Sequence, residues 1–215
     1  MRGKMALALV GALLLFATAA GAFDIAQTEQ VMQAFTGVIN TSTERPSLLA
    51  ALGMLRDAAW EPSLPAARRL ALTSDDADVR HGALQLLGWH GAARDWEILV
   101  IGLYSDDEGD VLAAVRAVEQ YGDERGLDHL ADLAEYDARP AVSAAAAEGR
   151  ARLVEFLAAM AGPMARELGV ADLPQLRASL MSARVSGDED ARERADAIAT
   201  TMRLVMRRAA AEADP

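Results

Sequence analysis

Apolar and polar positions along most of this chain alternate with the three- and four-residue spacing of amphipathic α-helices. In residues 23–41 the apolar residues include Met32, Phe35 and Ile39, which fall on one helical stripe. Similar stripes recur after a polar break, and they predict further helices over residues 47–57, 62–72, 78–89, 93–103, 110–121, 124–135 and 140–160. No stretch of β-branched and aromatic residues alternates with polar ones, so the pattern predicts an all-α fold.

Two of the predicted helical pairs are near copies of each other. Residues 74–91 read SDDADVRHGALQLLGWHG, and residues 105–122 read SDDEGDVLAAVRAVEQYG, at an offset of about 31 residues. A repeat of this length is typical of stacked helical units that bury their apolar faces against their neighbours. Weaker copies before and after them extend the predicted array to about four helical pairs over residues 43–161.

The polar positions of the repeat have local structural roles. Ser and Asp residues at 74–76 and 105–107 precede a helix, where their side chains cap free backbone N–H groups. Gly91 and Gly122 follow the first helix of each pair, where a glycine in the left-handed conformation commonly ends a helix. A calcium loop would need a glycine at its sixth position and a distal glutamate, so capping turns are the better interpretation.

One repeat also carries a recognisable motif. Asp-Val-Arg at residues 78–80, Gly-Ala-Leu at 82–84 and Leu-Gly at 87–88 resemble the short HEAT-like repeat also found in phycobilin lyases. The next repeat departs from that pattern at Leu112 and Glu119. The resemblance implies a right-handed α-solenoid, but no particular function, because such repeats serve many roles.

The first residues have the features of a secretory signal peptide. Arg2 and Lys4 precede an apolar run of about 16 residues, which is shorter than the roughly 20 residues needed to span a bilayer. A small-x-small site at residues 20–22 predicts cleavage after Ala22 and a periplasmic or secreted bacterial protein. An uncleaved membrane anchor is the alternative. After cleavage, residues 23–42 form an N-terminal helix and no stable membrane span remains.

The C-terminal residues 162–215 are predicted to form a helical extension that begins at the Gly162-Pro163 pair. In its last helix, Ile198, Met202 and Val205 belong to an apolar series with the spacing of a coiled-coil seam. This helix either caps the array or forms a dimer seam, so a structural homo-oligomer stays open as one function.

Composition and motifs exclude several classes of function. The chain has no cysteine, so it can form no disulfide and no thiolate metal site. Its formal net charge of -11 repels phosphate backbones, which argues against nucleic acid as a partner. The sequence also lacks HExxH, Gly-x-Ser-x-Gly and phosphate-binding glycine motifs. We therefore expect a protein that is not an enzyme and holds no metal or cofactor.

The best functional signal is a candidate surface for a protein or peptide partner. Second helices of such arrays line up along one side, and Ile98 and Ile101 stand where neighbouring repeats carry polar residues. Either a terminal segment covers these isoleucines or they form an apolar patch for a partner. The candidate partner-binding residues are Arg68, Arg69, Arg94, Ile98, Ile101, His129 and Asp132.

We therefore expect an envelope scaffold or assembly factor that binds another polypeptide without chemistry. The alternative is a small-ligand-binding or enzymatic protein that uses the polar cluster of Asp128, His129 and Asp132. An acidic pair beside His129 would favour its charged form, but the cluster lacks a nucleophile.

Overall fold

The computed structural model describes residues 25–168 of the 215-residue chain, and its side chains over residues 28–158. Within that range it contains eight α-helices and no strand. The all-α prediction is therefore confirmed for this part of the chain. The predicted signal peptide lies outside the described residues, as does nearly all of the C-terminal extension with its proposed seam.

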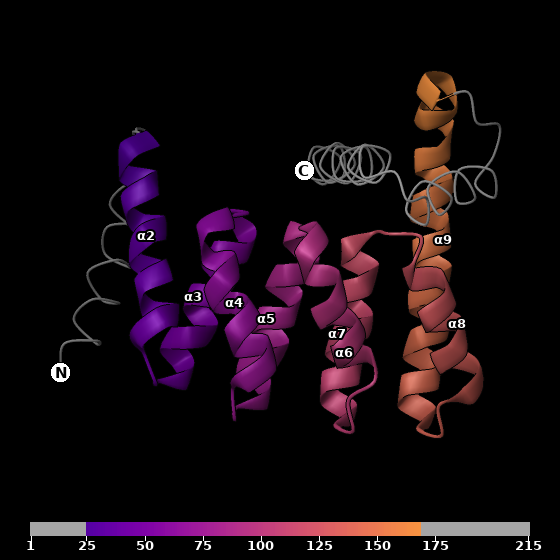
Figure 1. Cartoon of the computed structure of the whole chain (residues 1–215), viewed down its shortest axis with the longest axis horizontal. Helices are drawn as coiled ribbons and strands as arrows, with labels where there is room; N and C mark the ends of the chain where they lie inside the picture. The colour runs from indigo at the N-terminus through magenta and orange to yellow at the C-terminus, as the bar shows by residue number, and fades with distance from the viewer. Residues whose placement is uncertain (1–24, 169–215) are drawn as a thin grey trace, which may run out of the picture. The chain divides into compact units, whose positions relative to one another are not determined.

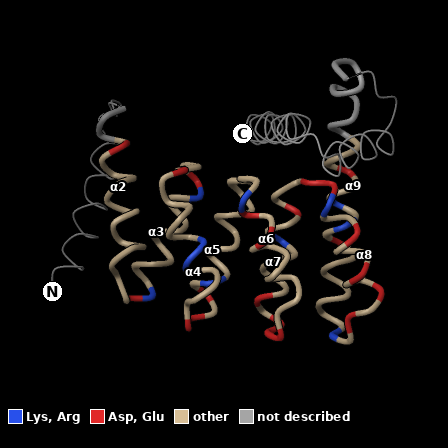
Figure 2. Tube along the Cα trace, in the orientation of Figure 1, with Lys and Arg blue, Asp and Glu red and all other residues tan. Residues whose placement is uncertain are grey.

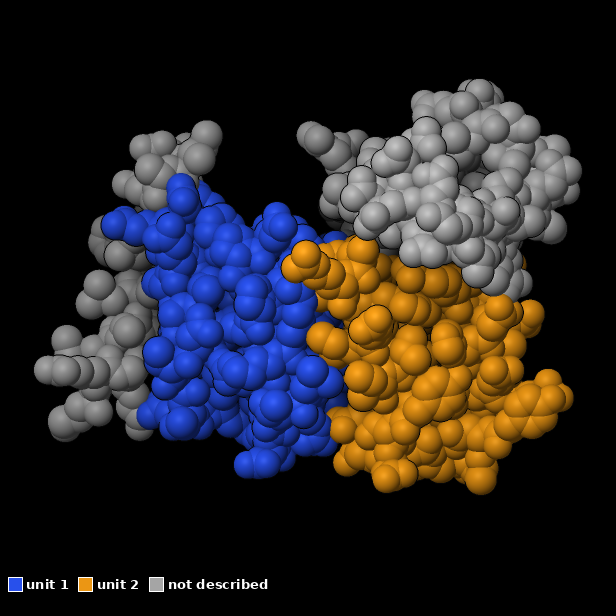
Figure 3. All heavy atoms as spheres, in the orientation of Figure 1, with its two compact units in different colours: residues 1–90 blue, residues 91–215 orange. Residues whose placement is uncertain are grey.

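The chain forms two compact units, Met1–His90 and Gly91–Pro215 (Figure 3). The described elements of unit 1 are α2 (Ile25–Thr41), α3 (Arg45–Asp57), the 3-10 turn η1 (Glu61–Ser63), α4 (Leu64–Thr73) and α5 (Ala77–His90) (Figure 1). Helix α2 packs on α3, and α3 and α4 both pack on α5. The predicted stripe of α2 is buried at Met32, Phe35 and Ile39.

The described elements of unit 2 are the 3-10 turn η2 (Ala93–Asp95), α6 (Trp96–Leu103), α7 (Glu108–Tyr121), α8 (Gly126–Tyr136) and α9 (Pro140–Leu168). Helix α7 packs against both α6 and α9, and α8 packs against α9. The core includes Leu99, Val118, Leu130 and Leu153. Trp96 is also buried.

The predicted helices correspond to the observed ones, and most boundaries agree within two or three residues. The clear exception is α9, which continues to Leu168 through the Gly162-Pro163 pair. Our prediction of a helix break at that pair is wrong, as is the fourth helical pair predicted for residues 140–161, because α9 is one continuous helix there. Proline removes one backbone donor and crowds the preceding turn, which weakens a helix at one point without requiring that it end there.

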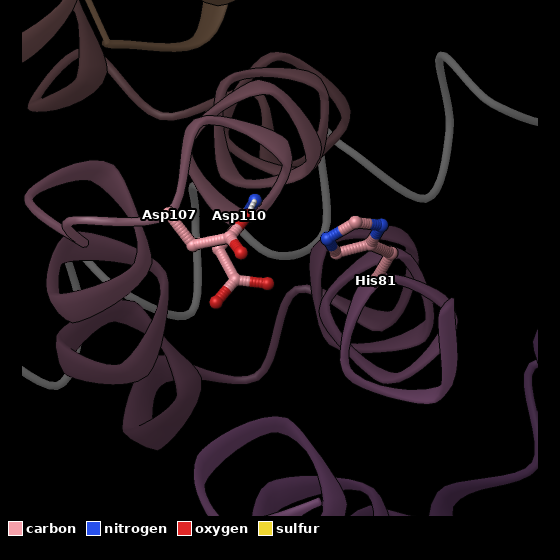
Figure 4. A group of neighbouring side chains, drawn as sticks. All are labelled: His81, Asp107 and Asp110. Carbon is pink, nitrogen blue, oxygen red and sulfur yellow. Dashed lines mark hydrogen bonds between the residues drawn. The ribbon is translucent and has the colours of Figure 1, made fainter. Parts of the chain in front are cut away.

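The predicted capping turns are present in both copies of the repeat. Asp76 accepts a hydrogen bond from the backbone N–H of Val79 through Oδ1 (3.2 Å), at the start of α5. Asp107 accepts one from the backbone N–H of Asp110 in the same way (3.0 Å), at the start of α7 (Figure 4). These acidic loops therefore satisfy backbone donors that a helix start leaves free.

Helices α3, α5 and α7, the first helices of three successive repeats, each end on a residue in the left-handed conformation. Gly91 and Gly122 both have φ of 69°, as their positions predict. After α3 this conformation falls on Ala59, with φ of 47°. The backbone N–H of Ala59 bonds to the carbonyl of Arg56 (2.9 Å), and that of Trp60 to the carbonyl of Leu55 (3.0 Å). This is a Schellman helix end in which alanine occupies the usual glycine position.

Replacing Ala59 with glycine should stabilise the protein. The left-handed conformation costs a residue with a Cβ about 1–2 kcal/mol, and glycine avoids this cost. Glycine also raises the conformational entropy of the unfolded chain, which offsets part of the stabilisation. We expect Ala59→Gly to raise the free energy of unfolding by about 0.5–1 kcal/mol, measured by urea denaturation.

The reverse change at the equivalent place in unit 2 is the matched control. A Cβ at Gly122 would lie 2.7 Å from Cε1 of Phe156, in addition to the strain of its positive φ. Gly122→Ala should therefore lower the free energy of unfolding by at least about 2 kcal/mol. Equal stability of wild type and Ala59→Gly would refute the assignment of strain to Ala59.

Two loops of unit 2 use the same Asp-x-Arg arrangement. Asp137 accepts hydrogen bonds from the backbone N–H of Arg139 (2.8 Å) and from its guanidinium (2.9 and 2.7 Å). Asp123 binds Arg125 through the same three donors. Arg139 also donates to the carbonyls of Ser105 and Asp106, which ties the loop before α9 to the loop before α7. These bonds to Arg139 lower the pKa of Asp137 from 3.8 to about 2.

The Asp137–Arg139 pair should make stability depend on pH in the acid range. Because the pKa of Asp137 is lower in the folded state, its contribution is complete above the unfolded pKa of 3.8 and disappears as the pH falls through about 2. Asp137→Asn should therefore lower the melting temperature at pH 7, and the difference from wild type should shrink toward pH 2.

Thermal unfolding by circular dichroism across this pH range tests the prediction. Glu155→Gln removes an exposed carboxylate of the same unit and serves as the control. A deficit of the Asp137→Asn variant that is constant over the whole range would contradict the charged role of Asp137.

Candidate functional site

The residues predicted to bind a partner fall in both units. Arg68 and Arg69 belong to α4 of unit 1, and the remaining five belong to η2, α6 and α8 of unit 2. The Arg69 guanidinium donates a hydrogen bond to the backbone carbonyl of Ile39 (3.0 Å), near the C-terminal end of α2. Arg69 thus holds α4 to α2 by satisfying a helix-end carbonyl, an internal role that sequence reasoning missed.

The exposed side of α6 is formed by Glu97, Ile101 and Tyr104, with Tyr104 directly after the last helical residue. Ile101 is 59% exposed and Tyr104 is 55% exposed. Ile98 is half-buried. Each residue turns the helix by about 100°, so Ile98 lies between the exposed side at Glu97 and the buried side at Leu99. Of the two isoleucines that sequence analysis selected, Ile101 is the outward one.

The outward side of α8 continues the polar and aromatic character of this region. His129, Asp132 and Tyr136 follow one another at three- and four-residue spacing, so they lie on the same side of α8. Asp132 is exposed, and Tyr136 is 73% exposed. The charged residues of α8 are three acids, with no arginine or lysine among them (Figure 2).

A tyrosine–histidine contact joins these two helices. The hydroxyl of Tyr104 and Nδ1 of His129 are hydrogen-bonded at 2.9 Å, and the two rings meet edge to face with centroids 5.8 Å apart. We use the name α6–α8 face for Ile101, Tyr104, His129, Asp132 and Tyr136. The structure thus brings together three of the predicted residues and adds two tyrosines.

Sequence reasoning missed Tyr104 and Tyr136, although the repeat contains a signal for them. Both stand at the end of the second helix of a pair, directly before the polar loop that leads to the next helix. A comparison of successive repeats at this position would have found the two tyrosines. It would not have shown that the first of them binds His129.

The α6–α8 face rests on a buried group of aromatic and charged side chains. His129 also contacts the ring of Trp96, with centroids 5.8 Å apart. On Trp96 lies the guanidinium of Arg125, 4.5 Å from the ring centroid. Burial alone would lower the pKa of Arg125, but hydrogen bonds and the charge of Asp123 outweigh it and raise this pKa. His129 is therefore positioned from two sides, by Trp96 and by Tyr104.

The electrostatics of the face suit binding better than nucleophilic chemistry. Partial burial raises the pKa of Tyr104, and the negative charge of Asp132 adds to the effect. A hydrogen bond with Glu135 raises the pKa of Tyr136, and the negative charge of Asp132 raises it further. Both phenols therefore stay protonated at neutral pH, whereas a nucleophilic residue needs a lowered pKa or an adjacent base.

Comparison with known proteins assigns no role to these residues. No family model matches the chain, and no curated protein matches it. Among the described helices, none is both long and apolar enough to cross a bilayer. The proposed seam residues Ile198, Met202 and Val205 lie outside the described range.

The position of Asp132 between the two tyrosines can be tested by titration. Removing its charge should lower the pKa of both Tyr104 and Tyr136, because a nearby negative charge disfavours a phenolate. Carbon-13 NMR of the tyrosine ring carbons in wild type and Asp132→Asn measures both values. Glu155→Gln is the control, and unchanged tyrosine pKa values in Asp132→Asn would contradict the arrangement.

Proposed function

We propose that this protein is an exported, HEAT-like α-solenoid that binds another polypeptide of the cell envelope as a scaffold or assembly factor, without catalysis. The observation that carries the proposal is the α6–α8 face. Of the five large apolar or aromatic side chains that are exposed among the described residues, three belong to this face. Apolar and aromatic groups gathered in this way are typical of binding surfaces.

The composition of the face supports binding of a polypeptide. Tyrosine combines a large apolar ring with a hydrogen-bonding group, and it is common among the residues that dominate interface energies. Tyr104 is already held by His129, so less side-chain freedom is lost when a partner binds. Acidic residues beside the apolar groups supply the polar rim that such interfaces carry.

Other parts of the chain support the compartment and the architecture in this proposal. The charged, apolar and small-residue segments of residues 1–22 favour export. The repeated helical pairs, with their equivalent capping aspartates and left-handed helix ends, favour a solenoid. Exposed surfaces on the second helices of such pairs are the usual binding sides of solenoids.

A paired substitution tests the role of the face. Ile101→Asp places a charge where an apolar side chain would be buried by a partner, and it should reduce recovery of that partner by at least about tenfold. Leu72→Asp makes the same change at a leucine of α4 that is 50% exposed and lies outside the face. We expect Leu72→Asp to recover the partner as wild type does.

The measurement is photo-crosslinking and affinity capture from the protein's own envelope fraction, followed by mass spectrometry. All variants must first give the same far-UV circular dichroism spectrum. A crosslinker at position 101 should trap the partner, and one at position 72 should not. Equal capture by wild type and Ile101→Asp would refute the face as the binding site.

A further inference from the structure

Resting on the function proposed above, we infer that the partner presents an arginine or lysine side chain to the α6–α8 face. In this arrangement Asp132 pairs with the cationic group, and the rings of Tyr104 and Tyr136 flank it. The occupant is therefore a segment of another polypeptide that contains a basic residue beside an apolar one.

The first argument is the position of Asp132 within the face. It lies three residues after His129, the hydrogen-bond partner of Tyr104, and four residues before Tyr136. Residues three and four apart on a helix are neighbours, with Cβ atoms about 5–6 Å apart. The exposed carboxylate is thus placed between two exposed aromatic side chains.

The second argument is that Asp132 binds no cation among the residues whose side chains the structure describes. Among the described residues, Asp123, Asp137 and Glu119 each bind an arginine. Asp132 forms no such ion pair in the described part of the chain, and it is exposed. Glu135 lies three residues further along α8 and is also exposed, so the neighbouring charge also favours a basic group.

The third argument comes from the same chemistry inside unit 2. There the Arg125 guanidinium binds the Asp123 carboxylate and lies over the Trp96 ring. The pair of a carboxylate and an aromatic face therefore already holds an arginine in this protein. At the α6–α8 face the carboxylate and the aromatic rings are present, and the partner would supply the cation. A cation beside aromatic rings is stabilised by cation–π attraction.

The neighbouring residues indicate what else the partner carries. Ile101 is three residues before Tyr104 on the exposed side of α6, so an apolar partner residue next to the basic one would contact it. Arginine should be preferred to lysine, because its planar group binds a carboxylate through two hydrogen bonds and also stacks on aromatic rings.

The test is selection of a random peptide library on the immobilised full-length protein, with selected peptides then synthesised and their Kd values measured. We expect the selected peptides to be enriched in arginine, and less strongly in lysine, next to an apolar residue. Asp132→Asn and Tyr136→Ala should each weaken their binding by up to about fivefold. Tyr136→Phe keeps the ring and should bind as wild type does, as should the control Glu155→Gln.

A charge exchange separates direct contact from a structural effect of the substitution. Asp132→Arg should lose the arginine-containing peptide and bind the same peptide with glutamate in place of arginine. A variant that has merely lost its structure would bind neither peptide and would show an altered circular dichroism spectrum. Tighter binding of the glutamate peptide to Asp132→Arg than to wild type would therefore identify the contact.

The outcomes distinguish this inference from the proposed function. Peptides that lack basic residues, or that bind Asp132→Asn unchanged, but are lost in Ile101→Asp, would overturn the inference and leave the proposed function standing. Absence of selected peptides, or binding unaffected by both substitutions, would overturn both. Selected peptides that match this chain's own sequence, together with a dimer in light scattering, would overturn the assignment to another polypeptide and identify a second copy.

Discussion

The structure depends on the need of its short helices to cover their apolar stripes with other helices of the same unit. In α7, seven of fourteen residues are buried, and the helix packs against both α6 and α9. In α8, four of eleven residues are buried, on the side that faces α9. Both helices of the candidate site keep one side exposed after this packing, at Ile101 and Tyr104 for α6 and at Asp132 and Tyr136 for α8. The candidate site lies on these two exposed sides, which the contact between Tyr104 and His129 joins.

Most charged groups near the loops are already used to hold this packing together. Asp76 and Asp107 cap helices, Asp123 and Asp137 bind arginines, and Arg69 closes the end of α2. A high content of acidic residues therefore says little about function in this chain. The informative carboxylate is Asp132, which none of these structural tasks explains and which lies beside exposed aromatic rings. Burial and internal partners, rather than the number of charges, separate functional from structural groups here.

Much of the helical fold could be predicted because its signals are local. Apolar spacing located the helices, and the serine and aspartate caps and the glycines at 91 and 122 marked their ends. The continuation of α9 through Pro163 was missed, because a proline changes the local cost of a helix without deciding where it stops. The left-handed Ala59 was also missed, since alanine gives no sign that its backbone must adopt that conformation.

The candidate site was predictable only in part, because its decisive contacts are not local. Ile101, His129 and Asp132 followed from helix register, which assigns residues to an outward side. The contact between Tyr104 and His129 joins residues 25 positions apart, and Arg69 binds a carbonyl 30 positions away. Such pairs depend on how two helices pack and on which side-chain rotamers that packing allows. The spacing of apolar residues within one helix predicts neither.

The α6–α8 face differs from the other charged sites of unit 2 in its exposure. Asp123 is buried and Asp137 is half-buried, and each binds an arginine, so their charges are satisfied within the fold. Asp132 is exposed and solvated, and a surface ion pair at this point would add only about 0–1 kcal/mol to stability. Its charge acts on both tyrosine hydroxyls and raises their pKa values. Stability therefore does not require an internal arginine here, and the carboxylate beside two exposed aromatic side chains stays accessible to the cationic group that we propose for the partner.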